Sequence, residues 1–172
     1  MILTGKEIIK RLGNDIIINP FDESQLNPNS YNLRLHDELL IYQSDILDIK
    51  QENITERIVI PEDGFILEPG ELYLCRTMEY TETYGLVPMI IGRSSVGRLG
   101  ITVHITSGFG DIGYCGYWTL QLTSIKKVKI YPGMKICQIY YQDILGDYDV
   151  YRSKKYQGSN EIMPSRIYKE FK

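Results

Sequence analysis

The chain has 172 residues, which is enough for one domain that buries its own core. Its 19 Lys and Arg residues nearly balance its 22 Asp and Glu residues, so a net charge of -3 excludes a general attraction to nucleic acid or anionic membranes. No apolar run approaches the length of a membrane span, and the first residues are not those of a secretory signal, so we expect a cytoplasmic protein without nucleic-acid or membrane partners.

The sequence predicts a short helix near its start. Thr4 can cap this helix with its hydroxyl group, and Glu7 follows three residues later as the partner in a capping box. Ile8, Ile9 and Leu12 then form an apolar stripe at helical spacing. We therefore expect a helix over residues 4–12.

From residue 30 onward the pattern changes to short apolar or alternating runs separated by turns rich in Pro and Gly. We expect strands at 32–35, 39–42, 58–60, 65–67, 72–75, 86–91, 101–105, 117–123, 128–130 and 136–141. So many short strands at close spacing indicate a mainly β sandwich or barrel and not a parallel α/β sheet. The sequence has no repeat or linker, so we expect one domain over residues 1–172.

The chain contains three cysteines, Cys75, Cys115 and Cys137, which lie far apart in the sequence. Each has apolar or aromatic neighbours. The odd number and the wide spacing favour reduced thiols over a disulfide framework or a zinc site.

The densest cluster of candidate ligand-binding residues is at 92–100. It contains three glycines together with Arg93, Ser94, Ser95 and Arg98. Arginines bind phosphate oxygens in bidentate fashion, hydroxyl groups donate to them, and glycines let backbone N–H groups approach. The chemistry is that of a phosphate site. However, the spacing is not that of a P-loop, and turns rich in Gly and Ser also occur in β-proteins without a ligand.

A second cluster lies at 106–122, where glycines at 108, 110, 113 and 116 predict a loop or hairpin that can enclose a planar base. Asp111 is the only acidic residue in this cluster. The residues alone also fit a β-turn in which the carboxylate of Asp111 bonds to its own backbone.

The strand expected at 117–123 has two different faces. Strand alternation places Trp118, Leu120 and Leu122 on one face, and Thr119, Gln121 and Thr123 on the other. The amide of Gln121 can orient a water molecule or bond the edge of a base, but it cannot carry a proton. The alternative is an exposed strand Gln without a role.

These segments resemble the signatures of the dCTP deaminase and dUTPase superfamily. The cluster at 92–100 is similar to the deaminase signature Gly-Arg-Ser-Ser, two variable residues, Arg-Leu-Gly. Further elements at 1–5, 30–35, 132–134, 155–158 and 164–168 follow in the same order, so the resemblance covers nearly the whole chain. It implies a distorted jelly-roll β-barrel of the dUTPase-like type with a short N-terminal helix, assembled as a homotrimer with active sites between subunits. Residues 151–172 would form a C-terminal lid.

The resemblance also implies which residues do the chemistry. Asp111 would lie by the deoxyribose, and in dUTPases it activates the water that attacks the α-phosphate. Position 121 is where deaminases carry a Glu as general base, and Ser94 and Arg98 complete the catalytic set. The ligand would be a deoxypyrimidine nucleoside triphosphate, with Mg²⁺ held by the triphosphate and no metal ligand in the chain. The expected nucleotide contacts are Arg93, Ser94, Ser95, Arg98, Ser107, Gly108, Phe109, Asp111, Tyr151, Lys155 and Ser159.

The chain departs from the deaminase pattern at several positions, and three of these departures bear on catalysis and phosphate binding. Gln121 replaces the Glu, Ser159 replaces a Gln that contacts phosphate, and Glu161 replaces a flexible Gly. An acid at 161 opposes phosphate binding unless it points away. The Pro-Cys-x-x-Cys element of zinc-dependent deaminases is absent from the sequence, so any deamination would proceed without zinc.

Three functions therefore remain open. The first is a dCTP deaminase, which forms dUTP or continues to dUMP. The second is a dUTPase, which needs no Glu at position 121. The third is a non-catalytic nucleotide-binding homologue, which the changes at 121, 159 and 161 favour.

Overall fold

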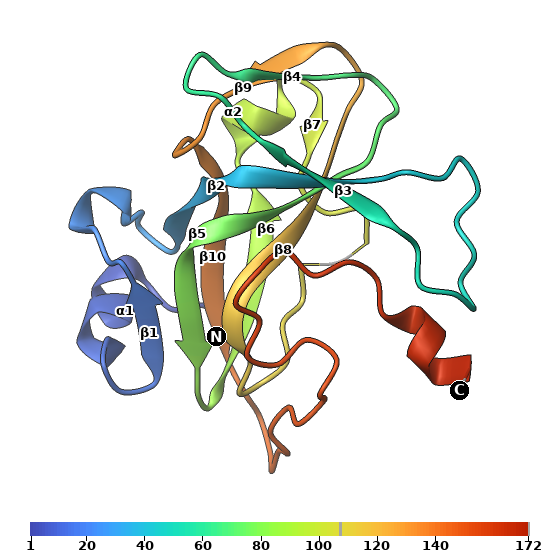
Figure 1. The fold of residues 1–172 in the computed structure, drawn as a ribbon. Helices are drawn as coiled ribbons and strands as arrows, with labels where there is room; N and C mark the ends of the chain where they lie inside the picture. The colour runs from blue at the N-terminus through green and yellow to red at the C-terminus, as the bar shows by residue number, and fades with distance from the viewer. Residues whose placement is uncertain (107, 172) are drawn as a thin grey trace.

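The computed structural model describes residues 1–106 and 108–171 and is built mainly from β-strands (Figure 1). In chain order the elements are α1 (Gly5–Arg11), β1 (Ile16–Asn19), the 3-10 helix η1 (Glu23–Gln25), β2 (Tyr31–Tyr42), β3 (Thr55–Val59), β4 (Phe65–Leu67), β5 (Tyr73–Thr83), β6 (Leu86–Gly92), α2 (Ser94–Gly97), β7 (Ile101–Thr102), β8 (Cys115–Ser124), β9 (Val128–Ile130), β10 (Lys135–Asp143) and the 3-10 helix η2 (Ile167–Phe171). The expected mainly β class is confirmed.

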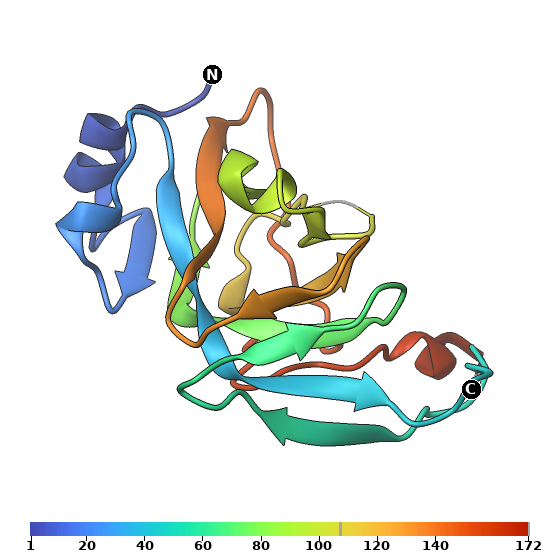
Figure 2. The ribbon, with the colours of Figure 1, turned by 90° about the horizontal axis from the view of Figure 1, so that it is seen from above.

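Eight strands form one curved antiparallel sheet. Its main path runs β6-β10-β2-β5-β8-β7, while β1 pairs with β5 and β3 pairs with β2. The backbone at 108–110 then approaches the free edge of β6, where the Ile90 N–H donates to the Gly108 carbonyl at 2.7 Å. The sheet therefore nearly closes into a barrel. Seen from above, the strands curve around the core, with α1 and β1 to one side (Figure 2).

The N-terminal helix forms as expected, although only half of its predicted capping box is present. The Thr4 hydroxyl accepts a hydrogen bond from the Glu7 N–H at 3.3 Å. The Glu7 carboxylate, however, binds Lys10 at 3.3 Å and Arg11 at 3.2 Å. These cations are one turn away, which explains why the carboxylate does not bond back to the cap.

The largest error of the sequence analysis concerns β5, which continues to Thr83 and not only to residue 75. Its second half points polar side chains at the core, because Thr77, Glu79, Thr81 and Thr83 are all buried. The strand alternation is intact, but its inward face is not apolar, so a search for apolar residues misses it. The sequence analysis also missed the apolar β1, because it sought strands only from residue 30 onward, and it split β2 into two strands at the polar residues 36–38.

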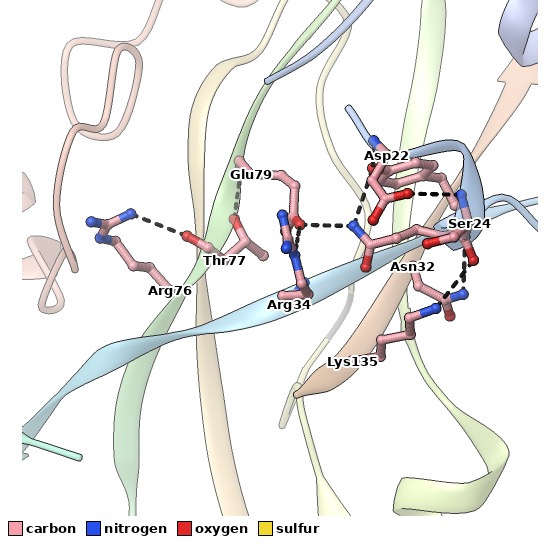
Figure 3. Close-up of polar contacts among 10 residues, drawn as sticks. Asp22, Ser24, Asn32, Arg34, Arg76, Thr77, Glu79 and Lys135 are labelled. Atoms are coloured by element: carbon pink, nitrogen blue, oxygen red, sulfur yellow. Dashed lines mark hydrogen bonds and ion pairs between the residues drawn. The ribbon is translucent and has the colours of Figure 1, made fainter. Parts of the chain in front are cut away.

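A buried ion pair makes this polar interior possible (Figure 3). The Glu79 carboxylate is fully buried and accepts hydrogen bonds from the Arg34 Nε at 2.7 Å and the Arg34 backbone N–H at 2.8 Å. The Gln25 Nε2 donates to the same carboxylate at 3.0 Å. A buried charge is tolerated only when it is paired and hydrogen-bonded, and these contacts supply both partners. They also connect η1, β2 and β5.

The C-terminal segment, residues 156–171, runs along the outer side of the barrel in front of β8 (Figure 1). The Tyr117 N–H donates to the Ser159 carbonyl at 3.0 Å, and the Met163 N–H donates to the Thr119 hydroxyl at 3.0 Å. Ile162 is 2% exposed and packs in a small cluster with Leu40 and Leu74. Backbone hydrogen bonds and the buried Ile162 side chain therefore hold this segment on its own barrel.

Candidate active site

A cavity of about 470 Å³ lies between the outer face of β8, the loop before it and the C-terminal segment. Most of the residues on its wall are apolar or aromatic, and Asp111, Gln121 and His104 also border it. The wall is formed by Tyr42, Leu72, Leu74, His104, Phe109, Gly110, Asp111, Tyr114, Trp118, Thr119, Gln121, Tyr151, Tyr156, Ser159, Met163 and Ser165. An apolar cavity with a few convergent polar groups is typical of a small-molecule site.

Glycines place Asp111 at this cavity by allowing close backbone packing. A Cβ at Gly108 would stand 1.5 Å from the Ile90 carbonyl oxygen, so only glycine lets the loop pair with β6. Gly116 has a φ of +148° and touches the backbone of Ser159 in the C-terminal segment. These two glycines therefore serve contacts within the protein, and Asp111 is left exposed on the loop between them.

Gln121 lies on the predicted polar face of β8. Trp118, Leu120 and Leu122 are buried, as the alternation indicates. The Gln121 amide nitrogen donates to the Thr119 carbonyl at 3.4 Å, and its Oε1 lies 3.0 Å from the His104 Nδ1. Burial lowers the pKa of His104, and the hydrogen bond to Gln121 opposes this effect. A neutral histidine thus stands beside the amide.

The candidate phosphate loop forms the short helix α2 and the turn after it, not a simple turn. The Arg93 Nη1 donates to the Lys135 carbonyl at 3.0 Å, which fixes one guanidinium against β10. Ser94, Ser95 and Arg98 are exposed. Arg93 and Ser94 border a second cavity of about 550 Å³, between β6 and the segment at 101–104.

Within one chain, the predicted site residues are therefore divided between two cavities. Asp111, Gln121, Phe109, Tyr151 and Ser159 border the first, and Arg93 and Ser94 border the second. His104 borders both. Ser95, Arg98, Gly108 and Lys155 border neither cavity, and Ser107 lies outside the described residues.

The two replacements in the tail take part in contacts within the chain. The Ser159 hydroxyl donates to the Glu161 carbonyl at 2.9 Å, and the residue is buried. The Glu161 carboxylate lies 3.4 Å from the Arg57 Nη2 and does not border the cavity. Glu161 thus points away, which is the condition under which an acid here does not oppose phosphate. Lys155 forms an ion pair with Glu170.

The sequence analysis did not identify several residues on the cavity wall. His104 is one of only two histidines in the chain and lies two residues before the second cluster, which is the signal that was available. Tyr156 and Met163 reach the cavity from the C-terminal segment. Their position depends on how that segment docks, which no local pattern indicates.

The described residues contain no group of three His, Cys, Asp or Glu side chains able to hold a metal ion. All three cysteines are free, as expected. In the same part of the chain, no helix has the length and apolar character needed to cross a membrane.

Comparison with known proteins identifies the family of the chain. The family model described as dCTP deaminase-like matches residues 2–144. A protein of Clostridium beijerinckii named "dCTP deaminase, dUMP-forming" is 60% identical over 99% of both chains. A protein with the same name from Cytophaga hutchinsonii is 56% identical over 99% of both chains.

Solved structures share the fold at low identity. The 2'-deoxycytidine 5'-triphosphate deaminase of Agrobacterium tumefaciens matches with a TM-score of 0.64 and 22% identity, over 81% of this chain and 46% of that chain. A mutant dUTPase from phage phi11 of S. aureus matches with a TM-score of 0.50 and 13% identity, over 83% of this chain and 99% of that one. These neighbours confirm the dUTPase-like barrel. Together with the sequence relatives, they show that the chain belongs to the dCTP deaminase-like family of enzymes.

Proposed function

We propose that the enzyme converts dCTP to dUMP, with dUTP formed on the way. The observation that carries this proposal is the 470 Å³ cavity that brings Asp111 and Gln121 together, in a chain whose relatives are named for this reaction. The balanced conversion uses dCTP and two water molecules and releases ammonia, pyrophosphate and dUMP. Its place in the cell would be the supply of deoxyuridine nucleotides for dTTP synthesis.

The residues divide into two groups by what they offer. The aromatic wall of the cavity suits a pyrimidine, and Gln121 can orient a water molecule at its edge. Asp111 would activate the water that attacks the α-phosphate. Arg93, Ser94 and Arg98 would bind the phosphate oxygens by charge-assisted hydrogen bonds.

We further propose that the site is completed in a homotrimer. Support comes from the separation of Asp111 and Gln121 from the phosphate loop, which borders a different cavity of the same chain. A second copy can bring its own phosphate loop to the base cavity. Sedimentation should show a particle of three times the 19.9 kDa chain mass. A monomer with full activity contradicts the shared site.

We propose Mg²⁺ only as an ion bound to the triphosphate, not as one held by side chains of the enzyme. The described residues do not fit a resident ion, because no three ligand side chains gather among them. Chelation of Mg²⁺ should therefore raise the KM for nucleotide without lowering the melting temperature of the enzyme.

The test of function is product analysis. The enzyme is incubated with Mg²⁺ and either dCTP or dUTP, and the products are separated by chromatography while ammonia is measured. We expect ammonia and dUMP from dCTP, and dUMP from dUTP. Asp111→Asn should abolish the formation of dUMP and leave the deamination step.

One observation favours a second function, a dUTPase without deaminase activity. Gln121 stands where a proton carrier is expected, and an amide has no accessible pKa. In that case dUTP gives dUMP while dCTP gives no ammonia. The absence of turnover with both nucleotides indicates instead a nucleotide-binding homologue.

A further inference from the structure

His104 is held against Gln121 by both backbone and side-chain contacts. The Gln121 backbone N–H donates to the Val103 carbonyl at 3.0 Å, which aligns β8 with the segment that follows β7. The side chains then meet with the His104 Nδ1 3.0 Å from the Gln121 Oε1. His104 borders both cavities, so it stands between the cavity for the base and the cavity of the phosphate loop.

The hydrogen bonds of Gln121 determine which ring nitrogen carries the proton. The Gln121 amide nitrogen donates to the Thr119 carbonyl, so its oxygen is the atom that faces the ring. A carbonyl oxygen only accepts, so the His104 Nδ1 is the donor and the Nε2 keeps its lone pair. This Nε2 is buried and has no hydrogen-bond partner among the described residues. A buried acceptor without a partner requires an explanation.

The surroundings favour the neutral ring. Burial lowers the pKa of His104 below the ordinary 6.5, and the hydrogen bond to Gln121 opposes the shift. The other titratable side chains on the same cavity wall are Asp111 and four tyrosines, namely Tyr42, Tyr114, Tyr151 and Tyr156. Burial raises the pKa of Tyr114, so this group stays protonated. His104 is thus a neutral base beside the amide that cannot carry a proton.

We propose that binding of the nucleotide exposes the buried Nε2 of His104 to the cavity, and that this nitrogen then carries the protons of the deamination while Gln121 only holds the ring in place; this rests on the proposed function. The water oxygen bonds to C4 of the cytosine as one of its protons moves to Nε2. The electrons of the C4–N3 double bond move to N3, which then takes that proton from Nε2. Nε2 next accepts the proton of the new C4 hydroxyl group and delivers it to the amino group. The C4–N bond breaks, C4=O forms and ammonia leaves.

The test compares four enzymes: wild type, His104→Asn, Gln121→Glu and the double variant. Asn is the matched control, because its side-chain N–H can replace the Nδ1–H and keep the bond to Gln121 but cannot accept a proton. His104→Asn should lower the kcat for ammonia release by about 10² to 10⁴ in the wild-type background. In the Gln121→Glu background, where a carboxylate can carry the proton, the same change should cost less than about tenfold.

A second measurement does not depend on turnover. Since the chain has only two histidines, ¹⁵N spectra of the imidazole rings can be assigned by comparing wild type with His104→Asn. We expect His104 to be protonated at Nδ1 in the neutral ring. In Gln121→Glu its pKa should rise, because a carboxylate beside the ring favours the charged imidazolium. Circular dichroism and binding of dCTP show whether each variant is folded.

The outcomes separate the two proposals. If wild type releases ammonia and folded His104→Asn does so equally fast, His104 is not the proton carrier and the deaminase function stands. A neutral ring protonated at Nε2 also overturns the role of His104. If only the two Gln121→Glu enzymes release ammonia, the deaminase function of the natural chain and the role of His104 both fail.

Discussion

Truncation of Ile162 should release the C-terminal segment without unfolding the barrel. The Ile162 side chain is 2% exposed and is the buried anchor of this segment in the cluster with Leu40 and Leu74. Ile162→Ala removes three carbons, worth about 2.4 kcal/mol at ~0.8 kcal/mol each. With the cavity left behind, the cost is about 2 to 5 kcal/mol. Even the lower limit raises the open population of the segment by about 30-fold.

Limited trypsin digestion measures this population, because the segment contains Arg166 and Lys169 and is directly preceded by Lys154 and Lys155. When opening is fast compared with cleavage, the cleavage rate follows the fraction of open molecules. The melting temperature of the barrel should change little, while the KM for nucleotide should rise because the segment forms part of the cavity wall. Ile46→Ala is the matched control, since Ile46 is 85% exposed. Equal cleavage of both variants refutes the anchor, as does a fall in melting temperature that accounts for the faster cleavage.

Three further predictions concern binding, folding and pH. Arg98→Ala should weaken triphosphate binding by about 1.5 to 3 kcal/mol with no loss of melting temperature, whereas Lys6→Ala should leave calorimetric affinity unchanged; equal affinities contradict the phosphate role. Arg34→Ala leaves the fully buried Glu79 carboxylate without its cation and should lower the free energy of unfolding by about 3 to 5 kcal/mol in urea titrations, so a loss under about 1 kcal/mol argues against the pair. Because the folded-state pKa of His104 lies below 6.5, the unfolded chain binds more protons as pH falls below that value. Stability should therefore fall between pH 7.5 and 5.5, less steeply in His104→Asn, and equal slopes would exclude this contribution.

The sequence predicted elements well where a strand has one apolar face. On β8, Trp118, Leu120 and Leu122 point inward, and the polar positions between them were assigned to the correct face. On β5 the inward residues include Glu79, which is stable there because Arg34 and Gln25 reach it from other elements. Whether such a strand forms depends on partners that lie far away in the sequence. Local periodicity therefore could not have found it.

The site was predicted in part for the same reason. Glycine spacing and the arginine-serine cluster indicated two candidate segments, but the glycines act mainly inside the protein, as Gly108 against Ile90 shows. His104 belongs to no recognisable motif. It becomes a candidate site residue only through its 3.0 Å contact with Gln121 on the neighbouring strand. Such a contact depends on strand register, which the sequence alone does not fix.

The outer face of β8 becomes a candidate site only because the C-terminal segment covers it. Without that cover, Gln121 and Thr119 would be ordinary polar residues on the solvent side of a sheet. The Met163 N–H bonds the Thr119 hydroxyl at 3.0 Å, and Ile162 fixes the adjacent backbone in its apolar slot. The cover lowers access of water to the polar face, and burial is what lowers the pKa of His104 beside Gln121. The docked segment and the neutral histidine border the same cavity, so we expect a change that undocks the segment to alter the protonation of the ring as well as the binding of nucleotide.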